Sequence, residues 1–277
     1  MTINCKGNLV DLASPRVMGI LNLTPDSFYD GGRYRLKDPI LNQTEKMLSD
    51  GATFIDLGGY SSRPGAKNIS EKEELNRLLP AVDILLETFP DILLSIDTFR
   101  SGVARASLER GAAMINDISA GKLDKKMMAT VSEFGVPYIM MHMKGTPQDM
   151  SSQTSYEDLI GEVLYYFSER LASARALGIK DIIIDPGMGF AKNTSQNFEL
   201  LRQFELLHTL DLPVLVGLSR KSMIYKILNI DAELALNGTT ALNMYALNKG
   251  ANILRVHDVK EAIECITLMG ELEAKKD

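Results

Sequence analysis

The chain has 277 residues, of which 45% are hydrophobic and 24% are charged, an ordinary composition for a globular protein whose core needs neither metals nor disulfides. Its 30 basic and 36 acidic residues give a net charge of −6, which argues against general nucleic-acid binding because that depends on a basic surface. No apolar stretch approaches the roughly 18 residues that span a membrane, and residues 1–10 lack the apolar region of a signal peptide.

The elements in chain order begin with residues 3–12, which are expected to form a small hairpin that closes the floor of the fold. Eight short apolar runs follow, separated by longer stretches with helical spacing. Such alternation indicates parallel strands that are buried on both faces. The predicted strands are residues 17–23, 53–57, 92–96, 113–116, 136–141, 181–184, 214–217 and 252–256. The predicted helices are residues 40–49, 71–87, 104–110, 156–176, 198–207 and 234–248.

Eight strand–helix repeats suit a closed (β/α)8 TIM barrel better than an open sheet, which typically has about five or six strands. No linker-like or low-complexity segment divides the chain, so one domain is expected over residues 1–277. The polar residues that are placed to cap helix N-termini are Ser101, Asp124, Ser195 and Asp258. The glycines that are placed to end a helix in the left-handed conformation are Gly51, Gly111, Gly178 and Gly250.

Every predicted strand ends in a polar side chain, which a buried core would not favour. In a (β/α)8 barrel the carboxyl ends of the strands carry the chemistry, so these side chains are expected to line one polar mouth. They are Asn22, Asp56, Asp97, Asn116, Asp117, His142, Asp185, Ser219, Arg220, Lys221, Arg255 and His257. Any one of them could instead be a cap or a turn residue, and His142 is equally well interpreted as a hydrogen-bonded core histidine.

Two chemical sets are present in this mouth. Asp97, Asn116 and Asp185 match the paired N–H groups of a flat heterocycle, because a carboxylate accepts two parallel hydrogen bonds. The residues that supply positive charge for a phosphorylated or otherwise anionic group are Arg63, Lys221, Arg255 and His257. A ligand with a hydrogen-bonding ring at one end and phosphate at the other would satisfy both sets.

Two glycine-rich segments, residues 24–35 and 58–69, exceed the usual length of barrel loops and are predicted to act as lids over the mouth. Phe28 on the first segment and the Arg63–Pro64 pair on the second favour lids over ordinary surface loops. The three histidines lack metal-ligand spacing, so no zinc site is expected.

Eight short motifs at successive strand ends resemble those of the dihydropteroate synthase family, from about residue 15 to the C-terminus. They are NLTPDSF at 22–28, SRPG at 62–65, SIDT at 95–98, IND at 115–117, MHM at 141–143, DPGMGF at 185–190, SRKS at 219–222 and RVHD at 255–258. One such motif is weak, whereas eight in order are specific. The resemblance implies a transferase of folate biosynthesis, which condenses 6-hydroxymethyl-7,8-dihydropterin pyrophosphate with p-aminobenzoate to give 7,8-dihydropteroate and pyrophosphate.

The resemblance also implies roles for individual residues. Those implied to be catalytic are Asp97, Lys221, Arg63 and Asp185. Those implied to hold the pterin ring are Asp97, Asn116, Asp185 and Lys221. Those implied to serve the pyrophosphate are Asn22, which would also bind Mg2+, together with Arg63, Arg255 and His257. Those implied to form the p-aminobenzoate pocket, where sulfonamides would compete, are Phe28, Ser62, Pro64, Phe190, Lys221 and Ser222. Further substrate-binding candidates near the mouth are Met141, Gly189, Gly217 and Ser219.

The chain departs from the family pattern at four positions. Tyr60 stands where the family usually has Glu, Ser62 where it has Thr, Tyr29 where Ser is common, and Ala191 where Gly is common. None of these departures removes a residue with a charged role, and Tyr60 is the one that bears on the behaviour of the second long loop.

Two other functions stay open at this point. One is a related pterin-binding barrel that transfers a methyl group from a folate to a corrinoid protein, although Arg63–Pro64 and the 219–222 run are not needed for that reaction. The other is a pterin-binding regulator without catalysis. The expected partners are small-molecule substrates, and the family resemblance implies a homodimer through the late helices. Cys5 and Cys265 are interpreted as reduced thiols, which favours a cytoplasmic protein.

Overall fold

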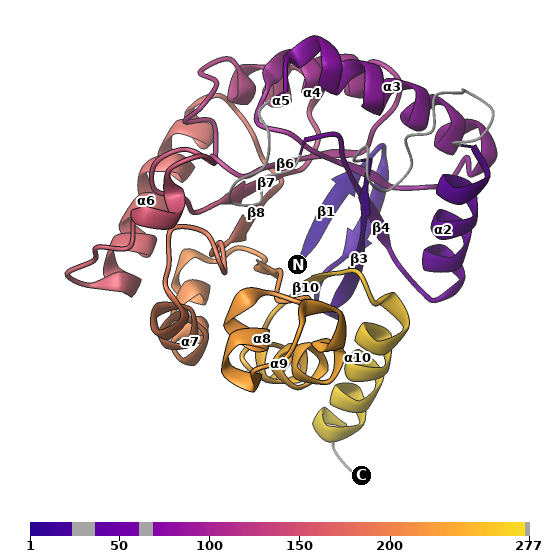
Figure 1. Ribbon diagram of the computed structural model, residues 1–277. Helices are drawn as coiled ribbons and strands as arrows, with labels where there is room; N and C mark the ends of the chain where they lie inside the picture. Colours follow the sequence, from indigo (N-terminus) through magenta and orange to yellow (C-terminus); the bar gives the residue numbers. More distant parts are fainter. Residues whose placement is uncertain (24–36, 61–68, 275–277) are drawn as a thin grey trace.

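In the computed structural model a ring of parallel strands is surrounded by helices (Figure 1). The structure describes residues 1–23, 37–60 and 69–274. The predicted N-terminal hairpin is present as the antiparallel strands β1 (Thr2–Cys5) and β2 (Asn8–Asp11). Ile3 and Cys5 pack against buried side chains near the starts of the barrel strands, among them Phe54. The hairpin therefore closes the amino-terminal end of the barrel, as predicted.

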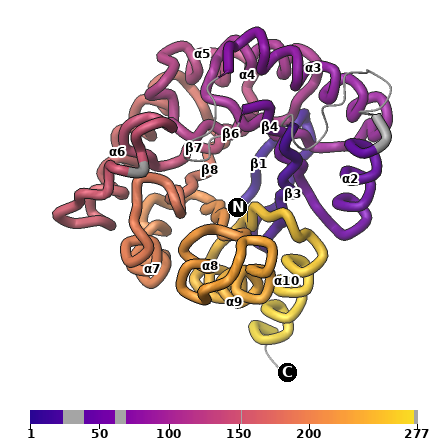
Figure 2. The backbone as a smooth tube through the Cα atoms, in the orientation of Figure 1, coloured from indigo at the N-terminus to yellow at the C-terminus, as the bar shows by residue number. Residues whose placement is uncertain are grey.

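Eight parallel strands form the barrel, and each of them corresponds to a predicted strand. They are β3 (Arg16–Asn22), β4 (Phe54–Gly58), β5 (Leu94–Asp97), β6 (Met114–Asp117), β7 (Tyr138–Met141), β8 (Ile182–Asp185), β9 (Leu215–Val216) and β10 (Ile253–Val256). Their order is β8-β7-β6-β5-β4-β3-β10-β9, and a parallel bridge from Ile184 to Val214 joins its two ends. The chain advances once around this ring, so β3 and β10 become neighbours, with Val17 aligned to Leu254 (Figure 2).

The helices around the barrel follow the predicted order. The α-helices are α2 (Lys37–Ser49), α3 (Glu71–Thr88), α4 (Ser101–Leu108), α5 (Met127–Phe134), α6 (Leu159–Ala176), α7 (Thr194–Arg202), α8 (Ser222–Leu228), α9 (Leu236–Asn248) and α10 (Val259–Glu273). The 3-10 helices are η1 (Met150–Ser152), η2 (Phe204–Leu210) and η3 (Ala232–Leu234). The helix predicted at 198–207 instead covers the end of α7 and the start of η2. Three of the described helices, α5, α8 and α10, are not among the predicted ranges.

The helix-ending glycines were predicted correctly. Each of the four has a positive φ, between 81° and 106°, just after α2, α4, α6 or α9. An L side chain is strained in that conformation, whereas glycine is not, so glycine can end the helix and turn the chain toward the next strand.

Three of the four predicted N-caps were wrong, and the fourth, Asp258, occupies the N-cap position of α10 but makes no capping hydrogen bond there. Ser101 opens α4 without capping it, and its backbone N–H donates to Asp124 Oδ2 at 2.7 Å. Asp124 itself lies two residues before the N-cap position of α5, which Lys126 occupies. Ser195 lies inside α7, and Asp258 precedes α10 without making a capping hydrogen bond. Ser101 and Ser195 lie inside their helices, and Asp124 lies too far before its own helix. Asp258 binds Arg220 instead.

The true cap of α7 is Asn193, two residues before the predicted one. Its side chain accepts a hydrogen bond from the Gln196 backbone N–H at 2.9 Å, and the Gln196 side chain accepts one from the Asn193 backbone N–H at 2.9 Å. This reciprocal pair is a capping box, which satisfies two backbone donors at the helix start.

Both cysteines are buried and unpaired. Burial raises the pKa of the Cys5 thiol to about 12, so this thiol stays protonated at neutral pH. Among the described helices, none combines the length and the apolar character that a bilayer crossing requires.

Candidate active site

A network of charged side chains lies at the carboxyl ends of four neighbouring strands, β4, β5, β6 and β10. Arg255 Nε lies 2.6 Å from Asp56 Oδ2, and Arg255 Nη2 lies 2.9 Å from Asp97 Oδ2. Asn116 Nδ2 donates to the same Asp56 oxygen at 3.0 Å. The pairing β10-β3-β4-β5-β6 brings these residues together although Asp56 and Arg255 are 199 positions apart. Four strand-end residues predicted to line the mouth, Asp56, Asp97, Asn116 and Arg255, therefore meet.

Burial sets the electrostatics of this network. It raises the pKa of Asp97 to about 7, while the positive charge of Arg255 opposes that rise. Burial acts to lower the pKa of Arg255, but the carboxylates of Asp56 and Asp97 outweigh it and raise the value. Asp56 Oδ1 is buried and has no hydrogen-bond partner in the described part of the chain. An acceptor left in this way is what a ligand with N–H groups, or a bound water, would satisfy.

A second charged pair lies across the mouth, at the ends of β8 and β9. Asp185 Oδ1 accepts a hydrogen bond from the Gly187 backbone at 2.7 Å, and burial raises the pKa of this carboxyl while Lys221 opposes the rise. Burial lowers the pKa of Lys221 to about 8, against the opposing effect of Asp185. Lys221 Nζ donates to the Met188 carbonyl and lies 5.0 Å from the centre of the Phe190 ring.

Two glycines leave room for the Lys221 side chain. A Cβ atom at Gly189 would lie 3.3 Å from Lys221 Cδ, and one at Gly217 would lie 3.7 Å from Lys221 Nζ. The predicted substrate-binding positions Gly189, Phe190 and Gly217 therefore surround Lys221. Ser222 follows directly as the first residue of α8.

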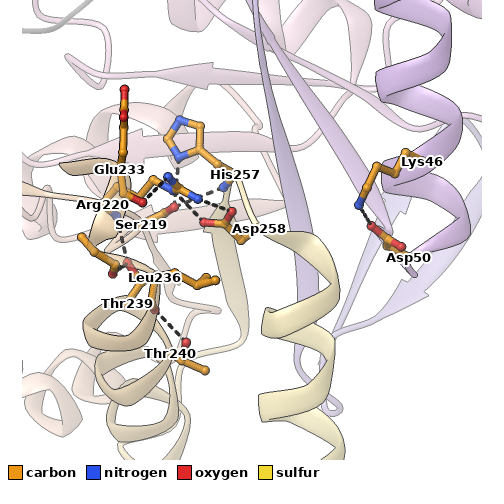
Figure 3. Close-up of polar contacts among 11 residues, drawn as sticks. Lys46, Asp50, Ser219, Arg220, Glu233, Leu236, Thr239, Thr240, His257 and Asp258 are labelled. Atoms are coloured by element: carbon orange, nitrogen blue, oxygen red, sulfur yellow. Dashed lines mark hydrogen bonds and ion pairs between the residues drawn. The ribbon is translucent and has the colours of Figure 1, made fainter. Parts of the chain in front are cut away.

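The loop that carries Lys221 is fixed from behind by Arg220 (Figure 3). The guanidinium of Arg220 binds both oxygens of Asp258, at 2.7 and 2.9 Å, and its Nη1 donates to the Glu233 carbonyl at 3.0 Å. Ser219 Oγ lies 2.9 Å from His257 Nδ1. This contact joins the ends of β9 and β10. Arg220 thus points away from the mouth, while Ser219 and His257 form a hydrogen-bonded pair at its edge.

Two predicted mouth residues turn out to be internal. The carboxylate of Asp117 accepts hydrogen bonds from Ser119, Gly121 and the Tyr138 hydroxyl, at 2.6–2.8 Å. The His142 side chain is buried, and its Nδ1 lies 2.9 Å from Lys192 Nζ. Asp117 is therefore satisfied within the protein, and the core interpretation of His142 agrees with its surroundings.

Of the remaining predicted site residues, some lie in the described part of the chain and others lie outside it. Met141 is buried in an apolar cluster with Met143 and Ala191, against which Phe190 packs. Asn22 ends β3, and no described hydrogen bond involves its side chain. The predicted residues Phe28, Ser62, Arg63 and Pro64 lie outside the described residues, as does most of each predicted lid.

Sequence reasoning left two buried charged residues out of the candidate site. Asp56 was predicted only as a strand-end residue of the mouth, because its sequence position does not distinguish it from a turn residue; its ion pair with Arg255 makes that distinction. Lys192, two residues after the DPGMGF motif, was not among the predicted site residues, yet it is buried, with 7% of the residue exposed. A lysine directly after a glycine-rich strand-end loop was the only available signal.

The family model described as "Pterin binding enzyme" matches residues 18–257. The dihydropteroate synthase of Escherichia coli is 41% identical over 280 residues, an alignment that covers 100% of this chain and 99% of that protein. The chain belongs to the dihydropteroate synthase family. It is therefore an enzyme of the transferase class.

Solved structures of dihydropteroate synthases have the same fold. That of Yersinia pestis, in complex with a sulfonamide drug, superposes with a TM-score of 0.93 at 40% identity, covering 99% of this chain and 100% of that chain. That of Xanthomonas albilineans, in complex with 7,8-dihydropteroate, gives a TM-score of 0.88 at 34% identity and covers 100% of both chains.

Two departures from the dihydropteroate synthase pattern lie in the described residues. Tyr60 is 6% exposed, packs edge-on against Phe99 with ring centres 5.3 Å apart, and accepts a hydrogen bond from Gln148 at 3.0 Å. Tyr60 itself is therefore held by packing and by a neutral hydrogen bond, where a glutamate would bring a charge. Ala191 has a φ of 50°, a left-handed conformation that costs an L residue roughly 1–2 kcal/mol and a glycine little.

Proposed function

We propose that this chain joins 6-hydroxymethyl-7,8-dihydropterin pyrophosphate to p-aminobenzoate, with release of pyrophosphate, as its family membership suggests. The observation that carries the proposal is the set of buried acceptors at the barrel mouth, Asp97, Asn116 and Asp185, with Lys221 beside them. Carboxylates in such a setting match the paired N–H groups of a pterin ring.

The pterin ring would be bound from two sides of the mouth, by the network of Asp56, Asp97 and Arg255 and by Asp185. Asp97 and Asp56 are held in place by Arg255, so the acceptors are already oriented before the ring arrives, and little reorganisation is needed on binding. Asp185 faces the same site from β8, with one oxygen occupied by the Gly187 N–H. The ring would thus be held between β5–β6 and β8.

Arg255 has fewer N–H groups left for the pyrophosphate than the sequence suggested. Two of its nitrogens, Nε and Nη2, are already bound to carboxylates, whereas Nη1 makes no hydrogen bond to a described residue. We propose that Arg255 chiefly orients Asp56 and Asp97 and contributes one further N–H to the anion. His257 and Arg63 would then supply the remaining donors for the leaving group.

The reaction itself needs no protein nucleophile. Loss of pyrophosphate leaves a cation delocalised over the ring, which the carboxylates of Asp97 and Asp185 favour electrostatically. The aryl amine nitrogen then bonds to the ring methylene carbon and loses a proton. The protein must hold the two partners in line and keep water away from the cation. Lys221, beside Phe190, is placed to contact the aminobenzoate side of this arrangement.

The residues present fit a Mg2+ ion as a cofactor. Mg2+ prefers oxygen ligands and usually binds through one or two protein groups plus phosphate oxygens and water. The Asn22 amide oxygen would lie 3.4 Å from a Cβ atom at Gly58, so the absence of a side chain there keeps this oxygen accessible. When bound, the ion would neutralise charge on the leaving pyrophosphate.

We also propose that the chain forms a homodimer in the cytoplasm. Large apolar side chains are exposed together on the late helices α8, α9 and α10 and on η3. They are Ile227, Leu228, Leu234, Tyr245, Leu268 and Leu272, with exposed fractions from 38% to 73%. Exposed apolar side chains on helices that contact one another support association with a second copy, and the unpaired cysteines support a reducing compartment. Light scattering on a size-exclusion column should give twice the mass of one chain; a monomer would contradict the dimer.

The test is product formation by the purified full chain, given Mg2+, the pterin pyrophosphate and p-aminobenzoate. We expect 7,8-dihydropteroate by mass spectrometry, and Asp97→Asn should lower turnover by about tenfold or more because an acceptor becomes a donor facing a donor. Asp83→Asn, an exposed carboxylate paired with Arg110 on the outer helices, is the matched control and should be unaffected. Absence of product from the wild-type chain would contradict the proposed reaction.

A further inference from the structure

A buried lysine lies behind the loop that joins β8 to α7. Lys192 Nζ is 2.9 Å from His142 Nδ1, 3.2 Å from the Gly187 carbonyl and 3.1 Å from the Phe190 carbonyl. The Lys192 side chain is thereby surrounded by acceptors and removed from solvent, with 7% of the residue exposed. One ammonium group connects both ends of the 187–190 segment to the end of β7.

Two further hydrogen bonds fix the same loop. Asn197 Oδ1 accepts from the Gly189 backbone N–H at 2.6 Å, and the Tyr156 hydroxyl donates to the Ala191 carbonyl at 2.9 Å. The backbone also approaches β7 closely, because a Cβ atom at Gly187 would lie only 2.2 Å from the His142 carbonyl oxygen. The loop is therefore held against a neighbouring strand by its backbone as well as by side chains.

The opposite side of this loop faces Lys221. The Met188 carbonyl accepts a hydrogen bond from Lys221 Nζ, and the Phe190 ring lies 5.0 Å from the same nitrogen. Successive carbonyls thus have different partners: those of Gly187 and Phe190 bind Lys192, and that of Met188 binds Lys221. A change in the position of the loop would move the partners of Lys221 directly.

Burying a lysine costs hydration free energy, so an apolar side chain would be favoured if residue 192 only had to fill space. Burial lowers the pKa of Lys192 to about 7, and the charge of Asp185 only partly opposes this. No carboxylate lies within ion-pairing distance of its ammonium group in the described residues. An apolar side chain of similar length would avoid the loss of hydration. It would, however, remove the Lys192 donor from the Phe190 carbonyl and leave the Gly187 carbonyl with the Phe190 backbone N–H alone, at 3.0 Å.

We propose that Lys192 is a positioning residue for the aminobenzoate side of the site. It holds the 187–190 segment so that Phe190 and the Met188 carbonyl keep Lys221 in its binding position. This inference rests on the proposed function, because the aminobenzoate side is defined by that reaction. It assigns to Lys192 no contact with either substrate.

The test separates the two substrates. Lys192→Met keeps the length of the side chain and removes its donors, so the Michaelis constant for p-aminobenzoate should rise by about tenfold. The dissociation constant for the pterin pyrophosphate, measured by calorimetry without p-aminobenzoate, should change less, by no more than about threefold. Lys221 lies beside the ring acceptors, but Asp97 and Asn116 are on β5 and β6 and do not depend on this loop. Lys122→Met is the matched control: Lys122 Nζ lies over the Tyr166 ring at 4.2 Å, on the same side of the barrel, and makes no hydrogen bond to the 187–190 segment among the described residues. This control should leave both constants unchanged.

Two results would overturn the inference. One is an unchanged Michaelis constant for p-aminobenzoate in Lys192→Met; the other is an equal loss of affinity for both substrates, which would indicate a general structural role. If Lys192→Met fails to fold, Lys192→Gln decides the question, because its amide can still donate to one of the loop carbonyls; a rise confined to p-aminobenzoate is again expected. Failure of the proposed function would appear differently, as a wild-type chain that makes no dihydropteroate.

Discussion

Replacing Arg255 by Met should leave the carboxylates of Asp56 and Asp97 without their positively charged partner. In the wild-type chain the side chain of Asp56 is fully buried and that of Asp97 is 14% exposed, and Arg255 binds them at 2.6 and 2.9 Å. Removal of one partner from a buried ion pair costs about 3–5 kcal/mol of unfolding free energy, because the remaining charge is left uncompensated. We expect a loss of this size for Arg255→Met at about pH 8.5, where Asp97 is ionised.

The unfolding free energy lost in Arg255→Met should be larger at high pH than at low pH. Folding raises the pKa of Asp97 above its unfolded value, so the folded state binds the proton more tightly. The stability that this proton contributes is fully present below the unfolded pKa and is lost as pH rises through about 7. Without Arg255 the pKa of Asp97 should rise further, so the variant should be less destabilised at about pH 6 than at about pH 8.5.

Urea unfolding followed by circular dichroism at both pH values measures these losses. Arg105→Met is the matched control, because Arg105 binds Glu133 on the surface with the two side chains 40% and 58% exposed. That variant should unfold at nearly the same urea concentration as the wild-type chain at either pH, because an exposed ion pair contributes little to stability. A loss below about 1 kcal/mol for Arg255→Met at the higher pH, or a loss independent of pH, would refute the reasoning about the buried network.

Three further predictions concern other parts of the molecule. Asp185→Asn should weaken pterin binding by about 1–3 kcal/mol, measured by calorimetry, because an acceptor becomes a donor; unchanged affinity would remove Asp185 from the ring site. If Lys221 acts as a cation, kcat/KM should fall as pH rises through about 8, where burial places its pKa, and Lys221→Arg should lose this fall in the pH–rate profile. Asn193→Ala should cost about 1 kcal/mol in urea unfolding through loss of the capping box, whereas Ser195→Ala, inside the helix, should cost less than about 0.5 kcal/mol; equal losses would contradict the cap assignment.

The barrel could be predicted because its strands are short apolar runs and its helices end at glycines, and both signals are local. The N-caps could not be placed as well. Asn193 and Ser195 are both good capping residues, and only the backbone conformation at residue 193 decides between them. The helices α5 and α8 are 8 and 7 residues long, and so short a segment gives little helical periodicity. The helix α10 has 15 residues with a buried face, so its periodicity was present in the sequence and was missed.

The polar mouth could also be predicted, but the pairings within it could not. Nothing in the sequence shows that Arg255 lies between two carboxylates or that Asp117 is satisfied by Tyr138 and its own loop. These facts depend on contacts between strands far apart in the chain. For the same reason Lys192 could not be recognised as buried, because its acceptors come from β7 and from backbone carbonyls.

The most direct test of the proposed reaction is pyrophosphate release by the purified chain with Mg2+ and the pterin pyrophosphate, with and without p-aminobenzoate. We predict release that rises on addition of p-aminobenzoate and matches the dihydropteroate formed. If the pterin pyrophosphate binds but no pyrophosphate is released in either condition, the pterin-binding barrel stands and the proposed synthase reaction is contradicted.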